Sequence, residues 1–245
     1  MNSQPFSWIA KENGFVVVNK AQGVPCQREG DMPSILDYVS EALGQSVFLV
    51  HRLDRMTSGV LLLATTPEMN SALSRQFRER GVEKYYFALS LGRPSKKQGS
   101  IIGDMKAGRN GDWKLCRTVT NPAITQFFSA ATSQGLRLFV LKPYTGRTHQ
   151  LRVVLKSLGA VVLGDSRYGN QEQALRDAQR LGKEVVDRGY LHCYQLRFSV
   201  EGREYDFSCL PEQGDVFGIP EITALMEKYK QPYQLPWPKL QFSRS

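Results

Sequence analysis

Residues 47–64 read VFLVHRLDRMTSGVLLLA, two apolar runs separated by a charged segment. Each run has the length and composition of a buried β-strand, and the polar residues between them form a short link. Asp54 lies in this link, with Arg52 two residues before it and Arg55 directly after it. Nearby cations favour the ionised form of a carboxylate. Asp54 is therefore a candidate nucleophile, and an aspartate held in a structural salt bridge is the alternative interpretation.

On both sides of this segment, apolar runs alternate with helical patterns, separated by Gly and Pro. The predicted strands are residues 15–19, 47–50, 59–64, 84–91, 123–131, 136–141, 190–200 and 203–209. The predicted helices are residues 34–43, 66–80, a segment starting at Thr148, and 220–228. Gly81 is expected to end the second helix in a left-handed conformation, and residues 99–121 are expected to form a short strand and a long irregular loop. Many adjacent strand signals, one pair forming a hairpin, predict an α+β fold.

The helix predicted from Thr148 has two different faces. Its apolar stripe consists of Leu151, Val154, Leu155 and Leu158. On the opposite side, His149, Arg152 and Lys156 recur at helical spacing. Cations near a helix start oppose the helix dipole, so a carboxylate or phosphate is their expected partner there.

Composition excludes several classes of protein. The 245 residues carry a formal net charge of +9 and are 41% hydrophobic, which is ordinary for a folded domain and allows one large domain or two small ones. No apolar run approaches the roughly 20 residues of a membrane span, and the first residues do not resemble a secretion signal, so a cytoplasmic location is expected. The four cysteines are scattered, which argues against a zinc site. A basic charge alone leaves a nucleic-acid partner open.

Known catalytic signatures narrow the choice further. The phosphate-binding, dinucleotide-binding and serine-hydrolase glycine motifs are absent from the sequence. A glycosidase usually needs a second carboxylate, and none accompanies Asp54. A Ser-His-Asp arrangement using His51 and Asp54 has no support from spacing.

The segment HRLDxxTSGVLLLA, residues 51–64, resembles the catalytic motif of the RluA family of pseudouridine synthases. Three further segments agree with the family in order: NKxxG at 19–23, EKYYFAL at 83–89, and TGRTHQLR at 145–152 followed by LGDxxYG at 163–169. The resemblance extends from about residue 14 to residue 210. It implies a mixed, largely antiparallel central sheet flanked by helices, with a catalytic cleft across it.

The resemblance also implies roles for individual residues. Asp54 corresponds to the catalytic aspartate, Tyr86 to the active-site tyrosine, and Arg152 to the arginine that pairs with the aspartate. Arg52 corresponds to the arginine that helps to displace the target base. Three further residues are expected to bind substrate without a catalytic role: Arg55, Arg147 and His149.

The implied reaction is isomerisation of uridine to pseudouridine in structured RNA, without a cofactor or metal. Asp54 would attack the sugar C1′ or act as a base at the 2′ position, and the sequence does not choose between them. Two positions depart from the family pattern: Val154, where a histidine is common, and Ala21, where a proline is usual. Neither belongs to the proposed reacting groups.

The domain organisation expected from the resemblance is a catalytic domain over residues 1–210 and a C-terminal extension over 211–245. No added N-terminal RNA-binding domain is expected, and the protein is expected to act as a monomer. Its RNA partner would be transfer RNA, large-subunit ribosomal RNA, or both. A catalytically silent RNA-binding protein and a nucleoside or glycoside hydrolase are the alternative functions.

Overall fold

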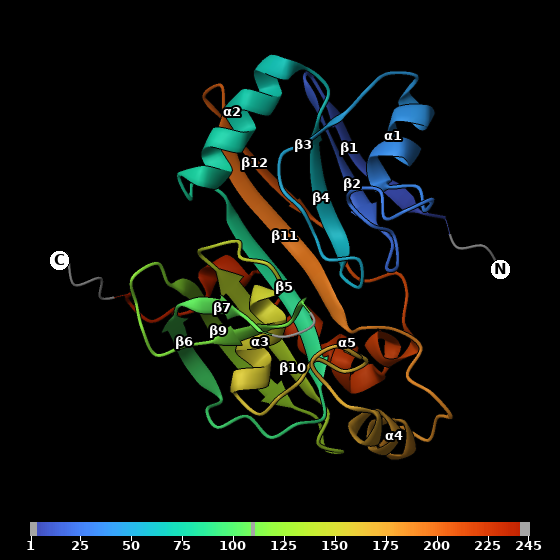
Figure 1. Ribbon diagram of the computed structural model, residues 1–245, viewed down its shortest axis with the longest axis vertical. Coiled ribbons are helices and arrows are strands. Elements are labelled where there is room, and N and C mark those ends of the chain that lie inside the picture. The colour runs from blue at the N-terminus through green and yellow to red at the C-terminus, as the bar shows by residue number, and fades with distance from the viewer. Residues whose placement is uncertain (1–3, 109–110, 241–245) are drawn as a thin grey trace.

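The computed structural model describes residues 4–108 and 111–240 and consists of one long twisted sheet with helices packed against it (Figure 1). The strand order is β1-β2-β4-β11-β5-β10-β9-β6, with β3 added on β4 and β12 on β11. A separate hairpin joins β7 and β8. The strands are β1 (Phe6–Glu12), β2 (Phe15–Lys20), β3 (Phe48–Leu49), β4 (Ser58–Ala64), β5 (Glu83–Ser90), β6 (Gln98–Gly103), β7 (Met105–Ala107), β8 (Trp113–Leu115), β9 (Ala123–Ala131), β10 (Arg137–Pro143), β11 (Leu191–Val200) and β12 (Arg203–Ser208). The α+β class predicted from the sequence is confirmed.

The sheet is antiparallel except where β4 meets β11. These two strands run parallel and pair only through His192 with Ser58 and Cys193 with Gly59. Gly59 is required at this junction, because its φ is +112° and a Cβ there would lie 2.2 Å from the carbonyl oxygen of Cys193. The junction joins an N-terminal part of the sheet to a C-terminal part, and the link containing Asp54 enters the sheet beside it.

The helices are α1 (Ile35–Leu43), α2 (Pro67–Arg78), α3 (Gln150–Ser157), α4 (Gln171–Arg180) and α5 (Pro220–Lys228). Two begin at or beside the residue predicted from sequence, and the cap predicted at Thr66 is confirmed. Ser34 and Asp37 form a reciprocal capping box at α1, and the Thr66 hydroxyl accepts the amide of Met69 at α2. Figure 1 shows α3 in front of β10, with β5 and β11 crossing the middle of the molecule.

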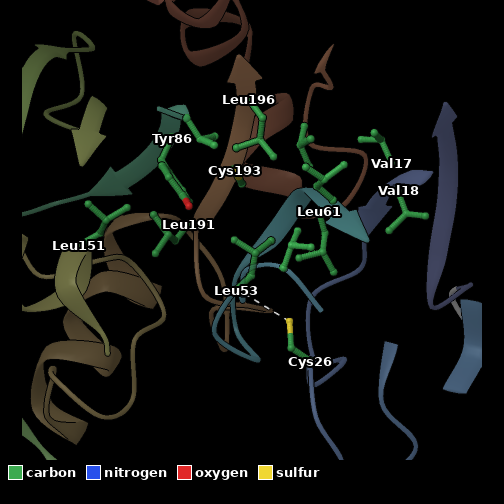
Figure 2. Packing of buried hydrophobic residues seen from close by; sticks show 14 of the residues in the cluster. Val17, Val18, Cys26, Leu53, Leu61, Tyr86, Leu151, Leu191, Cys193 and Leu196 are labelled. Carbon is green, nitrogen blue, oxygen red and sulfur yellow. Dashed lines mark hydrogen bonds between the residues drawn. The ribbon is translucent and has the colours of Figure 1, made fainter. Parts of the chain in front are cut away.

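The buried strands explain why the sequence motif folds as it does. Every residue of β2 and of β4 is buried, as their continuous apolar sequences predict for central strands. Val17, Val18 and Leu61 pack in the cluster that continues to Leu53, beside Asp54 (Figure 2). The apolar residues that flank the charged link thus fix its two ends.

Some elements differ from the sequence prediction. Helix α3 begins at Gln150 rather than Thr148, because His149 has a left-handed backbone with φ of 57°. The left-handed residue after α2 is Arg80 rather than Gly81. A Cβ at Gly81 would meet only the movable end of the Gln76 side chain, with Oε1 at 2.2 Å. Strand β1 and helix α4 were not expected at all.

The region 99–121 is more ordered than expected. It contains most of β6 and the β7–β8 hairpin, of which residues 109–110 lie outside the described residues. Asp104 caps the end of this segment by accepting the amides of Thr120 and Asn121 at 3.1 and 2.8 Å. The Tyr168 hydroxyl accepts the amide of Trp113 at 3.1 Å and so ties the hairpin to the segment after α3.

The described part of the C-terminal segment packs on the sheet. Trp237 lies 4.9 Å from Phe128 and 6.2 Å from Tyr85, ring centre to ring centre. Residues 241–245 lie outside the described residues, as do residues 1–3. In the described ranges, no helix is long and apolar enough to cross a membrane.

Candidate active site

A cleft of about 470 Å³ lies where the Asp54 link, the end of α2, β5 and the start of α3 meet. Asp54 is the one carboxylate among its lining residues, and its side chain is 19% exposed. Asp54 also receives a turn hydrogen bond, because the amide of Thr57 donates to its carbonyl oxygen at 2.9 Å. The candidate nucleophile identified from the sequence therefore faces a cavity rather than open solvent.

The loop after β2 holds the Asp54 link from one side. The buried thiol of Cys26 accepts the amide of Leu53 at 3.3 Å, as Figure 2 shows. Gly23 donates its amide to the carbonyl oxygen of Arg55 at 2.8 Å. These two bonds fix the backbone on both sides of Asp54. Cys26 was not expected to contribute, because nothing in its local sequence marks its partner.

Arg152 contacts two carboxylates. Its Nε and Nη2 donate to Asp165 at 2.7 Å each, and its Nη1 lies 3.4 Å from Asp54 Oδ2. The Asp165 side chain is fully buried and also accepts the amides of Arg167 and Tyr168. The structure thus brings Arg152 to Asp54, but its bidentate partner is Asp165, a residue to which the motif at 163–169 assigns no role.

Tyr86 lies on β5 and lines the same cleft, 7% exposed. Figure 2 shows its ring projecting from β5 beside Leu191. Burial raises the pKa of Tyr86 well above its ordinary value of 10, with further contributions from Cys193 and from the negative charge of Asp54. Tyr86 is therefore a neutral phenol that can donate a hydrogen bond or stack against a flat ring.

The cleft is otherwise strongly positive. Its cationic lining residues are Arg52, Arg78, Arg80, Lys84 and Arg147. Within the described residues, no carboxylate lies within 4 Å of any of these cations. Arg147 instead donates to the backbone and side-chain oxygens of Asn121. Five cations facing one aspartate form a surface suited to a polyanion. Arg78, Arg80 and Lys84 were not identified from sequence, because only the fold brings the end of α2 and the start of β5 to this cleft.

The two histidines of the cleft are neutral. His51 accepts the amide of Leu62 at Nε2, stacks 4.5 Å from the Phe77 ring, and has its pKa lowered to about 3 by burial and by Lys84. A triad that uses His51 as base is incompatible with that hydrogen bond. His149 Nδ1 lies 2.9 Å from the Tyr168 hydroxyl, and burial lowers its pKa.

Of the four expected substrate-binding residues, the structure places three in the cleft wall. Arg52, Arg147 and His149 line the cavity. Arg55 does not: it pairs with Glu29 at 3.2 Å on the surface and is about half exposed. Among residues 4–108 and 111–240, no group of His, Cys, Asp or Glu side chains is arranged to hold a metal ion.

Comparison with known proteins agrees with this architecture. Residues 14–157 match the family model described as RNA pseudouridylate synthase. A Haemophilus influenzae protein named as an uncharacterised RNA pseudouridine synthase is 42% identical over 222 residues, 90% of this chain and 94% of that one. The dual-specificity RNA pseudouridine synthase RluA of Escherichia coli is 36% identical over 175 residues, 67% of this chain and 77% of the relative.

Solved structures show the same fold. The human RNA pseudouridylate synthase domain containing 1 superposes with a TM-score of 0.73 at 24% identity, covering 96% of this chain and 97% of that one. The sheet, the position of the cleft and the sequence matches together define an RNA-modifying isomerase. The chain belongs to the RluA family of RNA pseudouridine synthases.

Proposed function

We propose that the enzyme isomerises a specific uridine in structured RNA, with Asp54 acting on a nucleotide flipped into the 470 Å³ cleft. One observation carries this proposal: among the described residues, Asp54 is the only carboxylate that lines a cleft presenting five cations. An RNA backbone approaching this face meets positive charge on both sides of the aspartate.

Three residues are assigned to the reaction itself. Asp54 acts on the sugar, as a nucleophile at C1′ or as a base at the 2′ position. Tyr86, held neutral, stacks on the uracil and donates or relays a proton through its hydroxyl. Arg152 holds the Asp54 carboxylate in position, and the bond to Asp165 keeps its own guanidinium fixed. The 19% exposure of Asp54 supports a site that closes around the released base.

The surrounding residues are assigned to RNA binding. Arg52 is exposed at the rim of the cleft, where it can enter the space that the flipped base leaves. Arg147 and His149 bind RNA from the opposite wall. Arg55 lies on the surface beside Glu29 and is assigned to contact the RNA backbone outside the cleft.

The substrate is proposed to be transfer RNA, large-subunit ribosomal RNA, or both. The Escherichia coli relative carries the description dual-specificity, which supports more than one RNA as substrate. The active unit is proposed to be a monomer. Free thiols at all four cysteines support a cytoplasmic location.

The test is to incubate the purified enzyme with total RNA from cells that lack it. Pseudouridine is then mapped by carbodiimide-dependent stops in reverse transcription. New stops at one or a few uridines, absent with Asp54→Asn, are expected. RNA binding without new stops would identify a catalytically silent binding protein, and release of free uracil would identify a hydrolase.

A further inference from the structure

A second cavity, of about 240 Å³, lies at the junction of β2, β4 and β11 and shares no lining residue with the catalytic cleft. Two cations, Lys20 and Arg188, lie in its wall. Both are buried: Lys20 is 0% exposed and Arg188 is 5% exposed. Buried cations are normally paired with carboxylates.

Neither cation has such a partner. Lys20 Nζ donates only to the carbonyl oxygens of Ala21 and Val24, at 2.9 and 2.7 Å. Arg188 donates to the Ser58 hydroxyl at 2.7 Å and to backbone carbonyls. In the part of the chain that the structure describes, no carboxylate lies within 4 Å of either group. Arg152, equally buried at 6% exposure, is held by two carboxylates.

The neutral residues around Arg188 have fixed roles. His192 Nε2 donates to the carbonyl oxygen of Cys209 at 2.9 Å, so its Nδ1 must accept from the Ser58 hydroxyl at 2.8 Å. Burial and the nearby Arg188 keep His192 neutral by lowering its pKa to about 3. Neither Ser58 nor His192 therefore offsets the positive charge of Arg188.

Asn19 provides an independent indication of a ligand. Its side chain is 7% exposed, lines the cavity, and makes no hydrogen bond to any described residue. The free hydrogen-bonding capacity of this amide is therefore open to the cavity, where a ligand can meet it. The one carboxylate of the lining, Glu212, is exposed and accepts the Ser7 hydroxyl at 3.3 Å.

We propose that this cavity binds a small tetrahedral oxyanion of the phosphate type, held by Arg188 and the Asn19 amide, with the positive charge of the fully buried Lys20 directly behind the wall. The charge of Asp54 acts on Lys20 and that of Asp187 acts on Arg188, but neither carboxylate forms an ion pair with these cations within 4 Å. The anion would supply the direct partner that Arg188 lacks. The pKa of Lys20 is lowered to about 8, mainly by burial and in part by Arg188, while Cys26 and Asp54 oppose the lowering. An anion near the two cations would oppose it as well.

Occupancy of this site would also stabilise the catalytic link. Lys20 holds the loop through Ala21 and Val24, and Gly23 of that loop donates to Arg55, next to Asp54. Ser58, bonded to Arg188, begins the strand that follows the link. The anion would therefore be a structural support for the active site rather than a participant in its chemistry.

The first experiment compares thermal unfolding in sodium phosphate and in sodium chloride at equal ionic strength and pH. The site predicts a saturable rise in Tm with phosphate. Because phosphate can also bind the cationic cleft, the variant Asn19→Asp is measured in parallel. Its carboxylate would replace the anion, so Tm in chloride should rise and the phosphate effect should disappear.

Asn13→Asp is the matched control, since it adds the same charge at an exposed turn between β1 and β2. It should retain the full phosphate effect. Lys20→Met is a second variant, and it should weaken the phosphate effect without adding a carboxylate. A phosphate effect that persists in Asn19→Asp would assign the anion to the catalytic cleft and overturn the proposal.

RNA binding distinguishes the two sources of the anion. If the ligand is free phosphate, Asn19→Asp and Asn13→Asp bind substrate RNA equally. If it is a phosphate of the RNA, Asn19→Asp binds more weakly than the control. No phosphate effect on the wild-type Tm, together with equal RNA binding by the two variants, would refute the site.

Discussion

Asp54 is the residue on which the proposed chemistry depends, and its isolation among cations makes its charge testable. Asp54→Asn keeps the shape of the side chain but removes the charged reacting group. Turnover should fall below detection, while RNA affinity should change little because the five cations of the cleft remain. Pseudouridine formation by mass spectrometry and filter binding measure the two effects. Measurable turnover by the purified variant would remove Asp54 from the mechanism.

Arg152 is expected to matter for stability as well as activity. Arg152→Met would leave the fully buried Asp165 without its bidentate partner. Breaking a buried ion pair from one side commonly costs about 3–5 kcal/mol. Urea unfolding should therefore show a large loss, and the double variant with Asp165→Asn should recover part of it. Wild-type stability in Arg152→Met would contradict the geometry of this pair.

Cys26 is a positioning residue, acting on Asp54 through the backbone of Leu53. Cys26→Ala would leave that buried amide without an acceptor, at a cost of about 1–3 kcal/mol, and would loosen the link. kcat should fall more than KM rises, because the RNA-binding cations do not move. Cys26→Ser supplies a hydroxyl acceptor and should restore kcat. Equal kcat for the Ala and Ser variants would show that Cys26 only fills space.

The junction of β4 and β11 depends on one glycine. A Cβ at Gly59 would collide with backbone atoms of Cys193, which cannot rotate away, and its φ of +112° adds strain. Gly59→Ala should therefore lose at least about 3 kcal/mol of stability. Gly202→Ala is the matched control: φ is +75°, but nothing lies within 4 Å, so only about 1 kcal/mol is expected. Similar Tm values for the two variants would contradict this.

The elements predicted correctly are those whose sequence carries a local signal. Continuous apolar runs identify β2 and β4, and Ser34 and Thr66 mark two helix starts. Helix α4 was missed because its sequence, QEQALRDAQR, has few apolar residues to show a period. The short strands β7 and β8 were missed because their pairing depends on contacts outside the segment, such as Trp113 with Tyr168.

The residues of the site also divide into those with a local sequence signal and those without one. Asp54, Tyr86 and Arg152 were identified by motif, and the structure brings them to one place. Cys26, the bidentate role of Asp165 and the cations at the end of α2 required the fold, because each depends on a partner far away in the sequence. The pairing of β4 with β11, which positions the cleft, has no local signal either.

At the scale of the whole molecule, two histidines that burial keeps neutral link folding to pH. The pKa of His51 and of His192 is lowered to about 3 by burial, against about 6.5 in an unfolded chain. Above pH 6.5 neither state binds these protons, so their contribution to stability is complete. Between pH 6.5 and 3 the unfolded chain binds both protons and the folded protein binds neither, so stability falls as the pH falls.

The expected loss is about 4 kcal/mol between pH 7.5 and pH 5, since each histidine contributes up to about 1.4 kcal/mol per pH unit below its unfolded pKa. Urea unfolding at pH 7.5, 6 and 5 measures it. His192→Gln lowers stability at every pH but should reduce the slope by about half, because one of the two linked protons is removed. The slope of the unfolding free energy against pH separates this titration from a packing defect, because a packing defect lowers the free energy equally at all three pH values. An unchanged slope in His192→Gln would show that His192 does not contribute to the acid sensitivity of the fold.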